Sequence, residues 1–394
     1  MYASSNAKTN NNNNNNNNNI AKRDVLLRQK KRRGVRKLKI VFVILALVIL
    51  DVKYADIHGR VSRRFKRDQR YSPSESVKSA CRASVFREFR PAPVTSVVSR
   101  INEKRGGGKL ECNLDAGLSI GYNCKRWWNP MARNRFYMFF TLDPEIDVYV
   151  SRHMLQNNGI FDEHVHAALG TALQRSKSSC DSKKNPILDV GSNLGSLTLA
   201  AASRFGCVVH AFEMQKDIAC RVRMSASSNA LDELISVHNV AVSSMDGQEK
   251  SYTTNERNPG GTGVVDVVEA GLSGHETSNI VSTVTLDSLF YGKVESIPFV
   301  KIDTEGHEHE VLKSAKLLLS QNIIKHLVVE IRRHQTQMVN FLYENRFTCH
   351  LLDYEKKSTF WNANPKCESG EKLDALLSKI TRIKLFSDLF CCHE

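Results

Sequence analysis

The residues with the clearest chemical meaning lie where a run of aliphatic residues gives way to glycine. The segment Pro186–Gly195 has the sequence Pro-Ile-Leu-Asp-Val-Gly-Ser-Asn-Leu-Gly and opens into a helix-forming stretch. Gly191 allows a tight turn close to a ligand, and Gly195 allows the helix to pack on the strand. Glu213 ends the next apolar run about 20 residues later, where a carboxylate can accept hydrogen bonds from both hydroxyls of a ribose. The spacing predicts a bound nucleoside.

Small differences within the turn indicate which nucleoside is bound. A dinucleotide-binding turn has three glycines, which let a pyrophosphate approach the helix N-terminus. Here Asn193 replaces the second glycine and Asp189 precedes the first. A carboxylate at that place would repel a pyrophosphate but suits a cationic ligand with an amino group, so we expect S-adenosylmethionine (SAM). A chance pair of glycines is the alternative for this segment alone, and Glu213 disfavours it.

A second group of charged residues follows the apolar run Pro298–Ile302. Open α/β sheets bind ligands at the carboxyl ends of their strands, so we expect Asp303 and Glu305 to reach the site. Glu308 and Glu310 would instead favour the start of the following helix through its dipole.

The sequence does not predict a metal site. His307 and His309 are two positions apart, and such side chains point in different directions on a helix. The chain has 10 cysteines but none in a C-x-x-C pair. Cys207 and Cys220 lie in apolar or helical stretches, where we expect buried thiols. If the chain is secreted, we expect some of the four cysteines Cys81, Cys112, Cys124 and Cys180 to form disulfides.

Short β-rich runs alternate with helical patterns after about residue 136, which is typical of an α/β domain with a mostly parallel sheet. The predicted strands are Ile187–Val190, Cys207–Glu213, Ile235–Val242, Phe299–Asp303, Leu327–Ile331 and Thr348–Asp353. The predicted helices are Ser196–Arg204, Lys216–Ala230, Glu308–Ser320 and Gln335–Glu344. A final run, Arg382–Phe390, would add an edge strand.

Six segments in this order resemble the FkbM-type SAM-dependent methyltransferase family over about residues 143–347. They are Leu188–Gly195, Ala211–Glu213, Asn239–Val242, Asn258–Gly263, Thr285–Leu289 and Lys301–Glu308. The resemblance implies an α/β class I methyltransferase Rossmann-like fold, with a mostly parallel central sheet and helices on both faces. It also implies O-methylation of a sugar or another small hydroxylated compound.

The resemblance assigns roles to individual positions. The residues implied to form the SAM pocket are Asp189, Gly191, Asn193, Gly195, Glu213 and Ala241. The residues implied to face the acceptor are Asp303, Glu305 and His307. His307 stands where the family has a small apolar residue, so it is a candidate general base, with an exposed helix histidine as the alternative. The acceptor itself would be determined by Thr253–Ser282 and Lys125–Arg135.

Charge is unevenly distributed along the chain. The net charge is +15, yet residues 1–110 carry +19 and residues 111–394 carry −4. We divide the chain into a disordered Asn-rich and basic tail (1–37), an apolar signal anchor (38–55), a stem (56–135) and the methyltransferase domain (136–394). The excess of Lys and Arg before the apolar run favours a single-pass type II protein, with its catalytic domain in the lumen of the endoplasmic reticulum or Golgi.

Two other classes of function remain open. The basic N-terminus could tether a nucleic-acid methyltransferase, although the slightly acidic domain and the apolar run that follows the basic tract argue against nucleic acid as a partner. The chain could also be an inactive membrane scaffold with the same fold. The intact SAM-binding turn argues against that alternative.

Overall fold

The computed structural model describes residues 119–123, 137–175, 179–254, 258–266, 279–332, 335–352, 372–383 and 386–393. The expected tail, the apolar anchor and most of the expected stem lie outside these ranges, as does the segment Lys125–Arg135. Among the helices in the described ranges, none is long and apolar enough to cross a bilayer.

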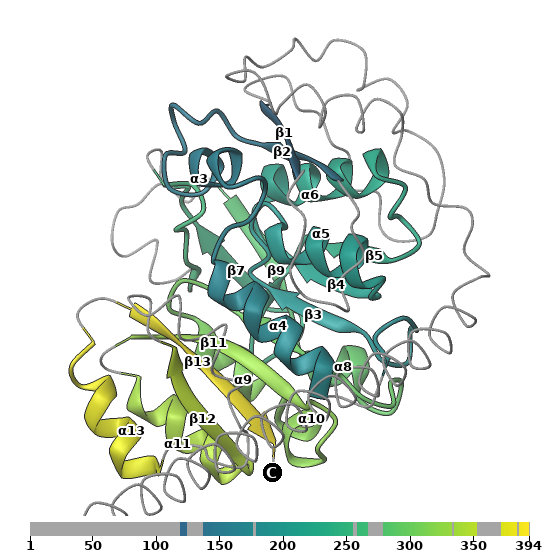
Figure 1. Cartoon of the computed structure of the whole chain (residues 1–394). Helices are drawn as coiled ribbons and strands as arrows, with labels where there is room; N and C mark the ends of the chain where they lie inside the picture. The colour runs from purple at the N-terminus through teal and green to yellow at the C-terminus, as the bar shows by residue number, and fades with distance from the viewer. Residues whose placement is uncertain are drawn as a thin grey trace, which may run out of the picture. The chain divides into compact units, whose positions relative to one another are not determined.

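Seven strands form the central sheet of the domain (Figure 1). In sheet order they are β12 (Phe347–Leu352), β13 (Phe386–His393), β11 (His326–Arg332), β10 (Val300–Ile302), β3 (Ile187–Val190), β4 (Val209–Phe212) and β5 (Ile235–His238). β11, β10, β3, β4 and β5 pair in parallel. The chain runs from β3 outward in one direction and from β10 outward in the other, so the strand order reverses between β3 and β10. Ligands bind open α/β sheets at such a point.

The last strand departs from the prediction. β13 pairs antiparallel with β11 on one side and with β12 on the other, so it lies inside the sheet and the edge strand is β12. The expectation of an edge strand from Arg382–Phe390 was therefore wrong. A local pattern indicates a strand but not its neighbours, because pairing depends on segments far away in sequence.

Helices cover both faces of the sheet. One core cluster joins apolar residues of the sheet with α8 (Leu286–Phe290), α9 (Glu308–Lys313), α10 (Lys316–Ser320), α11 (Thr336–Glu344) and α13 (Leu373–Ile380). The other face carries α4 (Glu163–Arg175), which crosses in front of the sheet in Figure 1, and α5 (Ser196–Ala200) with α6 (Lys216–Ser228). α5 and α6 share that face because right-handed crossovers join β3, β4 and β5.

Two predicted helices are interrupted. Ser196–Arg204 changes after Ala200 into a short π-helix, η2 (Ala201–Phe205). Glu308–Ser320 is divided into α9 and α10. Asp287 causes the second division, because its carboxylate accepts hydrogen bonds from the backbone N–H groups of Leu317 and Leu318 and so begins a new helix there.

The predicted strand Ile235–Val242 is divided between two sheets. Its first half is β5, while Ala241–Val242 forms β6 and pairs with β9 (Asn279–Val284). Asn239 fixes the bend, because its side-chain amide donates to the carbonyl oxygens of Glu213 and Met214. The smaller sheet also holds β7 (Glu249–Tyr252) and β8 (Val265–Asp266).

A short hairpin precedes this α/β core. β1 (Ser119–Asn123) pairs antiparallel with β2 (Tyr137–Thr141), and α3 (Ser151–Gln156) follows. β1 lies in the range expected to be stem, but its pairing joins it to a strand of the expected domain. α6 packs against β2. The backbone N–H of Phe140 donates to Ser225 of α6, so the hairpin is anchored to that helix.

The cysteine expectations were wrong for Cys207 and Cys220. Cys180 bonds to Cys207, and Cys220 is also disulfide-bonded. A further disulfide joins Cys349 to Cys391, which are register partners on β12 and β13. Neither apolar surroundings nor helical position indicated these bonds, because a disulfide requires a second cysteine nearby in space.

Candidate active site

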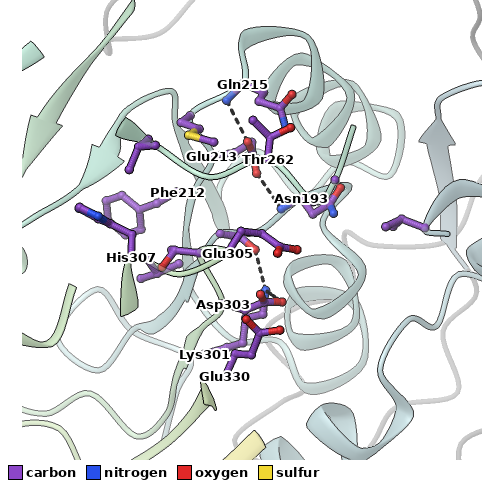
Figure 2. Close-up of a pocket in the computed structure, with 18 of the residues that line it drawn as sticks. Asn193, Phe212, Glu213, Gln215, Thr262, Lys301, Asp303, Glu305, His307 and Glu330 are labelled. Carbon is purple, nitrogen blue, oxygen red and sulfur yellow. Dashed lines mark hydrogen bonds and ion pairs between the residues drawn. The ribbon is translucent and has the colours of Figure 1, made fainter. Parts of the chain in front are cut away.

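A cavity of about 620 Å³ lies at the carboxyl ends of the central strands (Figure 2). Its walls come from the carboxyl ends of β3, β4, β10 and β11 and from the residues after β3, β4 and β10, with contributions from β6, the loop 258–264, the segment before α4, and β13. In Figure 2 Asn193, Glu213 and Gln215 occupy the upper part of the cavity, and Lys301, Asp303 and Glu330 the lower part. The volume is within the range of small-molecule sites.

Gly191 is required by the packing of the turn after β3. It has a φ of +73°, and a Cβ atom built on it would lie 1.8 Å from the carbonyl oxygen of Asp303. Its backbone N–H donates to the carbonyl oxygen of Phe212. The turn therefore lies directly against the segment after β10, where another residue would not fit.

Glu213 connects β4 to this turn. One carboxylate oxygen, Oε2, accepts a 2.9 Å hydrogen bond from the backbone N–H of Asn193, and Oε1 accepts one of 2.9 Å from that of Gln215. The side chain is 6% exposed. Burial raises the pKa of Glu213 to about 7, against the lowering effect of these two hydrogen bonds. A carboxylate fixed at the cavity wall can accept hydrogen bonds from ribose hydroxyls.

Two of the residues predicted to bind the cofactor do not line the cavity. Asp189 is 1% exposed, and its carboxylate accepts hydrogen bonds from the backbone N–H and the hydroxyl of Thr198, at 3.1 and 2.6 Å. It holds the start of α5 against β3 from below the turn. Gly195 instead packs against Val222, whose Cγ1 would lie 2.9 Å from an added Cβ. The turn motif can be recognised from a few neighbouring residues. Whether each of them faces the ligand or the core depends instead on how α5 and α6 pack against the turn.

The loop 258–264 closes the cavity between its two ends. An added Cβ on Gly260 would lie 2.4 Å from the amide nitrogen of Asn193, and one on Gly263 would lie 2.9 Å from the carbonyl oxygen of Glu305. The side chain of Gln215 donates to the carbonyl oxygen of Pro259 at 2.7 Å. This loop belongs to the segment that we expected to determine the acceptor. The predicted cofactor residue Ala241 also lines the cavity, on β6.

Lys301 links the two ends of the site. Its Nζ donates to the carbonyl oxygen of Gly191 at 2.6 Å and lies 3.2 Å from Asp303 Oδ2 and 3.9 Å from Asp189 Oδ1. Burial by itself would lower the pKa of Lys301, but the charges of Asp303 and Asp189 raise it above its usual value. Burial raises the pKa of Asp303, while Lys301 acts in the opposite direction. Asp303 is thus a stronger base than an exposed aspartate and is fixed relative to the turn.

The two residues after Thr304 adopt left-handed conformations. Glu305 has a φ of +57° and Gly306 one of +106°. Glu308 stabilises this shape, because Oε1 accepts hydrogen bonds from the backbone N–H groups of Thr304 and Gly306. Glu308 is buried. We expected it only to favour the start of the helix through the helix dipole, but its hydrogen bonds also hold the loop before the helix. Glu305 itself pairs with Arg332 at 2.8 Å.

His307 also lines the cavity. It is the N-cap residue of α9, and its Nε2 lies 3.0 Å from the hydroxyl oxygen of Ser243, which is buried. The alternative of an exposed helix histidine was therefore wrong.

Three further acids at the lower end of the cavity were not selected from the sequence: Asp162 before α4, Glu330 on β11 and Asp388 on β13. Burial raises the pKa of Asp162 to about 7 and that of Glu330 to about 9, and neighbouring carboxylates act in the same direction. Glu330 is the second-last residue of the predicted strand Leu327–Ile331, so a search for acids near strand ends, as for Asp303, could have found it. Asp162 and Asp388 carry no such signal.

Among the described residues, one group of three could bring oxygens to a cation: Asp303, Glu308 and Glu330, within 4.8 Å of one another. These carboxylates already contact Lys301, backbone N–H groups and Arg332. Neither His307 nor His309 belongs to the group.

The residues present fit SAM. Glu213 suits the ribose hydroxyls, and the neighbouring apolar wall suits a planar base; its residues are Phe212, Met214, Val240, Ala241 and Val242. An acidic lower end suits the cationic part of the cofactor and an acceptor without negative charge. The fold and the site together define a class I SAM-dependent methyltransferase.

Comparison with known families agrees with this class. Residues 189–356 match the methyltransferase FkbM domain. This part of the chain is an FkbM methyltransferase domain, as the sequence motifs predicted. No curated protein matches the sequence.

Comparison with solved structures finds methyltransferases of low sequence identity. The FkbM methyltransferase of Methylobacillus flagellatus KT is 12% identical and covers 62% of this chain and 60% of its own, with a TM-score of 0.32. The N-terminal domain of human METTL16 is 12% identical, with coverages of 61% and 69% and a TM-score of 0.32. A geranyl diphosphate C-methyltransferase from Streptomyces coelicolor is 12% identical, with coverages of 64% and 85% and a TM-score of 0.32. Similarities this low do not identify the acceptor.

Proposed function

We propose that the protein transfers the methyl group of SAM to a hydroxyl oxygen of a sugar, a glycan or another small metabolite. The observation that carries the proposal is the position of Asp303, a half-buried carboxylate held by Lys301 beside the cofactor turn. An oxygen acceptor needs a base for its proton, and Lys301 holds the carboxylate of Asp303 beside the turn.

Different residues bind the cofactor and activate the acceptor. When bound, SAM supplies a methyl group on a positively charged sulfur, which becomes a neutral thioether as the acceptor oxygen bonds to the methyl carbon. Glu213 and the turn at Gly191–Asn193 hold the nucleoside. Asp303 accepts the hydroxyl proton and orients the acceptor oxygen, so that alignment and proton removal occur together.

The acidic character of the cavity supports a small hydroxylated acceptor over nucleic acid. Five carboxylates and two cations line its lower end: Asp162, Asp303, Glu305, Glu330 and Asp388, with Lys301 and Arg332. A phosphate backbone is bound by clusters of Lys and Arg, which this surface lacks within the described residues.

Replacement of Asp303 by Asn tests the catalytic part of the proposal. The full chain with this substitution should still bind SAM in calorimetry, because Glu213 and the turn that would hold the nucleoside are unchanged. Methyl transfer should fall by about 10²–10⁴, the usual contribution of a general base. Asp374→Asn, an exposed aspartate on α13, is the matched control. Full turnover in Asp303→Asn would refute the role of Asp303, and absence of SAM binding by the unaltered chain would refute the enzyme itself.

We further propose that the chain is a single-pass type II membrane protein with this domain in the secretory lumen. The described cysteines support an oxidising compartment, because all of them are disulfide-bonded: Cys180, Cys207, Cys220, Cys349, Cys391 and Cys392. Protease protection in sealed microsomes tests the orientation. Digestion of the domain without detergent would contradict it.

A further inference from the structure

Two acidic residues stand opposite each other in the central sheet. Glu330 on β11 and Asp388 on β13 are register partners of an antiparallel pair, so their side chains project from the same face. Both line the cavity, and they are only 7% and 5% exposed. Two acidic groups directly opposite each other destabilise a sheet when both are ionised, and burial increases that cost. A pair of this kind at a cavity wall calls for a functional explanation.

The two carboxyl groups differ in their surroundings. Glu330 Oε2 lies 3.3 Å from the Nη2 atom of Arg332, but that same atom makes a shorter contact of 2.8 Å with Glu305. Asp388 Oδ2 contacts the Nε2 atom of His164, at the start of α4. Burial and the charges of Asp303, Glu305 and Glu308 raise the pKa of Glu330 to about 9. At neutral pH the carboxyl group of Glu330 therefore keeps its proton and can donate a hydrogen bond, next to the oxygens of Asp388.

The pair lies on the far side of Asp303 from the cofactor turn. In the sheet, β10 separates β3 from β11, and β13 follows β11. Because neighbouring strands are about 4.8 Å apart, Asp388 is roughly three strand spacings from the turn. An acceptor whose reacting oxygen lay beside Asp303 would therefore bring another part of its body to Asp388. Asp388 also lies outside residues 189–356, the part that matches the family.

We propose that Glu330 and Asp388 determine acceptor specificity: together they bind neighbouring hydroxyl groups of an uncharged polyhydroxylated acceptor and exclude acceptors that carry phosphate or carboxylate there. One hydroxyl accepts from Glu330 and the next donates to Asp388. An anionic group would meet the side chain of Asp388 in a region already rich in carboxylates. This inference rests on the proposed methyl transfer to a hydroxyl oxygen and adds the residues that select the acceptor.

Binding of sugars can be measured without turnover. The full chain saturated with S-adenosylhomocysteine is mixed with neutral methyl glycosides, or with the corresponding uronic acids and glycosyl phosphates. Saturation-transfer NMR then reports which compounds bind. We expect contact with neutral glycosides only. Asp388→Asn should weaken their binding by at least tenfold, whereas Glu330→Gln, which keeps a donor, should change it by less than about threefold.

Asp374→Asn on the exposed surface of α13 is the control for the aspartate substitution. Calorimetry with S-adenosylhomocysteine shows that each variant is folded, and its affinity should be unchanged in all of them. Equal binding of the anionic compounds, no binding of any glycoside, or unaltered binding by Asp388→Asn would overturn the inference.

Turnover with labelled SAM separates this inference from the function on which it rests. If neutral glycosides bind in the way described but receive no label, the proposed O-methylation fails while the specificity pair stands. If anionic acceptors are labelled as well as neutral ones, the methyltransferase stands and the specificity pair fails. With an acceptor in hand, Asp388→Asn should raise KM at least tenfold and leave kcat within about threefold, since Asp388 does not touch the reacting oxygen.

Discussion

The Nζ atom of Lys301 donates a 2.6 Å hydrogen bond to the carbonyl oxygen of Gly191, so a side chain of β10 holds the turn that follows β3. The same ammonium group, which is largely buried, pairs with Asp303 at 3.2 Å, and the carboxylate of Asp303 is partly exposed to the cavity. One lysine therefore bridges the turn after β3 and the carboxylate of Asp303.

Lys301→Met should lower the free energy of unfolding by about 3–5 kcal/mol, because it leaves buried carboxylates without their cation. Lys313→Met is the matched control: its ion pair with Glu310 is exposed, and its loss should cost less than about 1 kcal/mol. Urea denaturation of the full chain measures both values. Equal losses in the two variants would show that Lys301 does not balance the buried charges.

Gly191→Ala should be far more harmful than the same change elsewhere. The positive φ costs about 1–2 kcal/mol for alanine, and the overlap with Asp303 adds about 1–3 kcal/mol. Gly247 has a similar φ of +69° with nothing within 4 Å of an added Cβ, so Gly247→Ala should show the first cost alone. Thermal unfolding measures stability, and calorimetry with S-adenosylhomocysteine should show lost affinity only in Gly191→Ala.

Cofactor affinity should depend on pH through Glu213. The pKa of its carboxyl is about 7 in the free protein, and the ionised form accepts hydrogen bonds from ribose hydroxyls. Raising the pH through 7 removes the proton, so binding should tighten by about tenfold between pH 6 and pH 8. Glu213→Gln, which cannot ionise, should bind more weakly and show a flat profile. A profile shared by both proteins would assign the titration to another group.

The disulfide between β12 and β13 should contribute to stability. Cys349 and Cys391 are 42 positions apart, and a cross-link over such a loop stabilises by roughly 3–4 kcal/mol in the chain-entropy treatment. Replacement of both by Ala should lower the free energy of unfolding by that amount. Mass spectrometry of peptides prepared without reductant should find the bond in the native protein. Two free thiols there would contradict both the pairing and the proposed oxidising compartment.

Much of the fold could be predicted because its signals are local. Each strand of the parallel part is an apolar run bounded by turn residues, and β3 has the predicted bounds, Ile187–Val190. Gly191, Asn193 and Glu213 follow strands that must end at the same edge of the sheet, so their meeting is a consequence of parallel order. The same reasoning placed Asp303 and Glu305 in the cavity.

Other parts of the site depend on contacts that no local pattern records. Asp189 was predicted to contact the cofactor, but its carboxylate accepts a hydrogen bond from the hydroxyl of Thr198 on α5. His307 lies beside Ser243 because the chain leaves the central sheet after β5 and forms β6 in the smaller sheet. The continuous run Ile235–Val242 gives no sign of this change of sheet.

By itself, the sequence determined the class of the protein: a strand, a glycine turn and an acidic strand end are enough to define a SAM-binding fold, since each is encoded within a few residues. Only the tertiary structure decided how the lower end of the cavity is built. Asp388 stands opposite Glu330 because the last strand inserts antiparallel between β11 and β12. Sheet register is a property of two segments at once, and the residues that would select the acceptor are defined only when those segments pair.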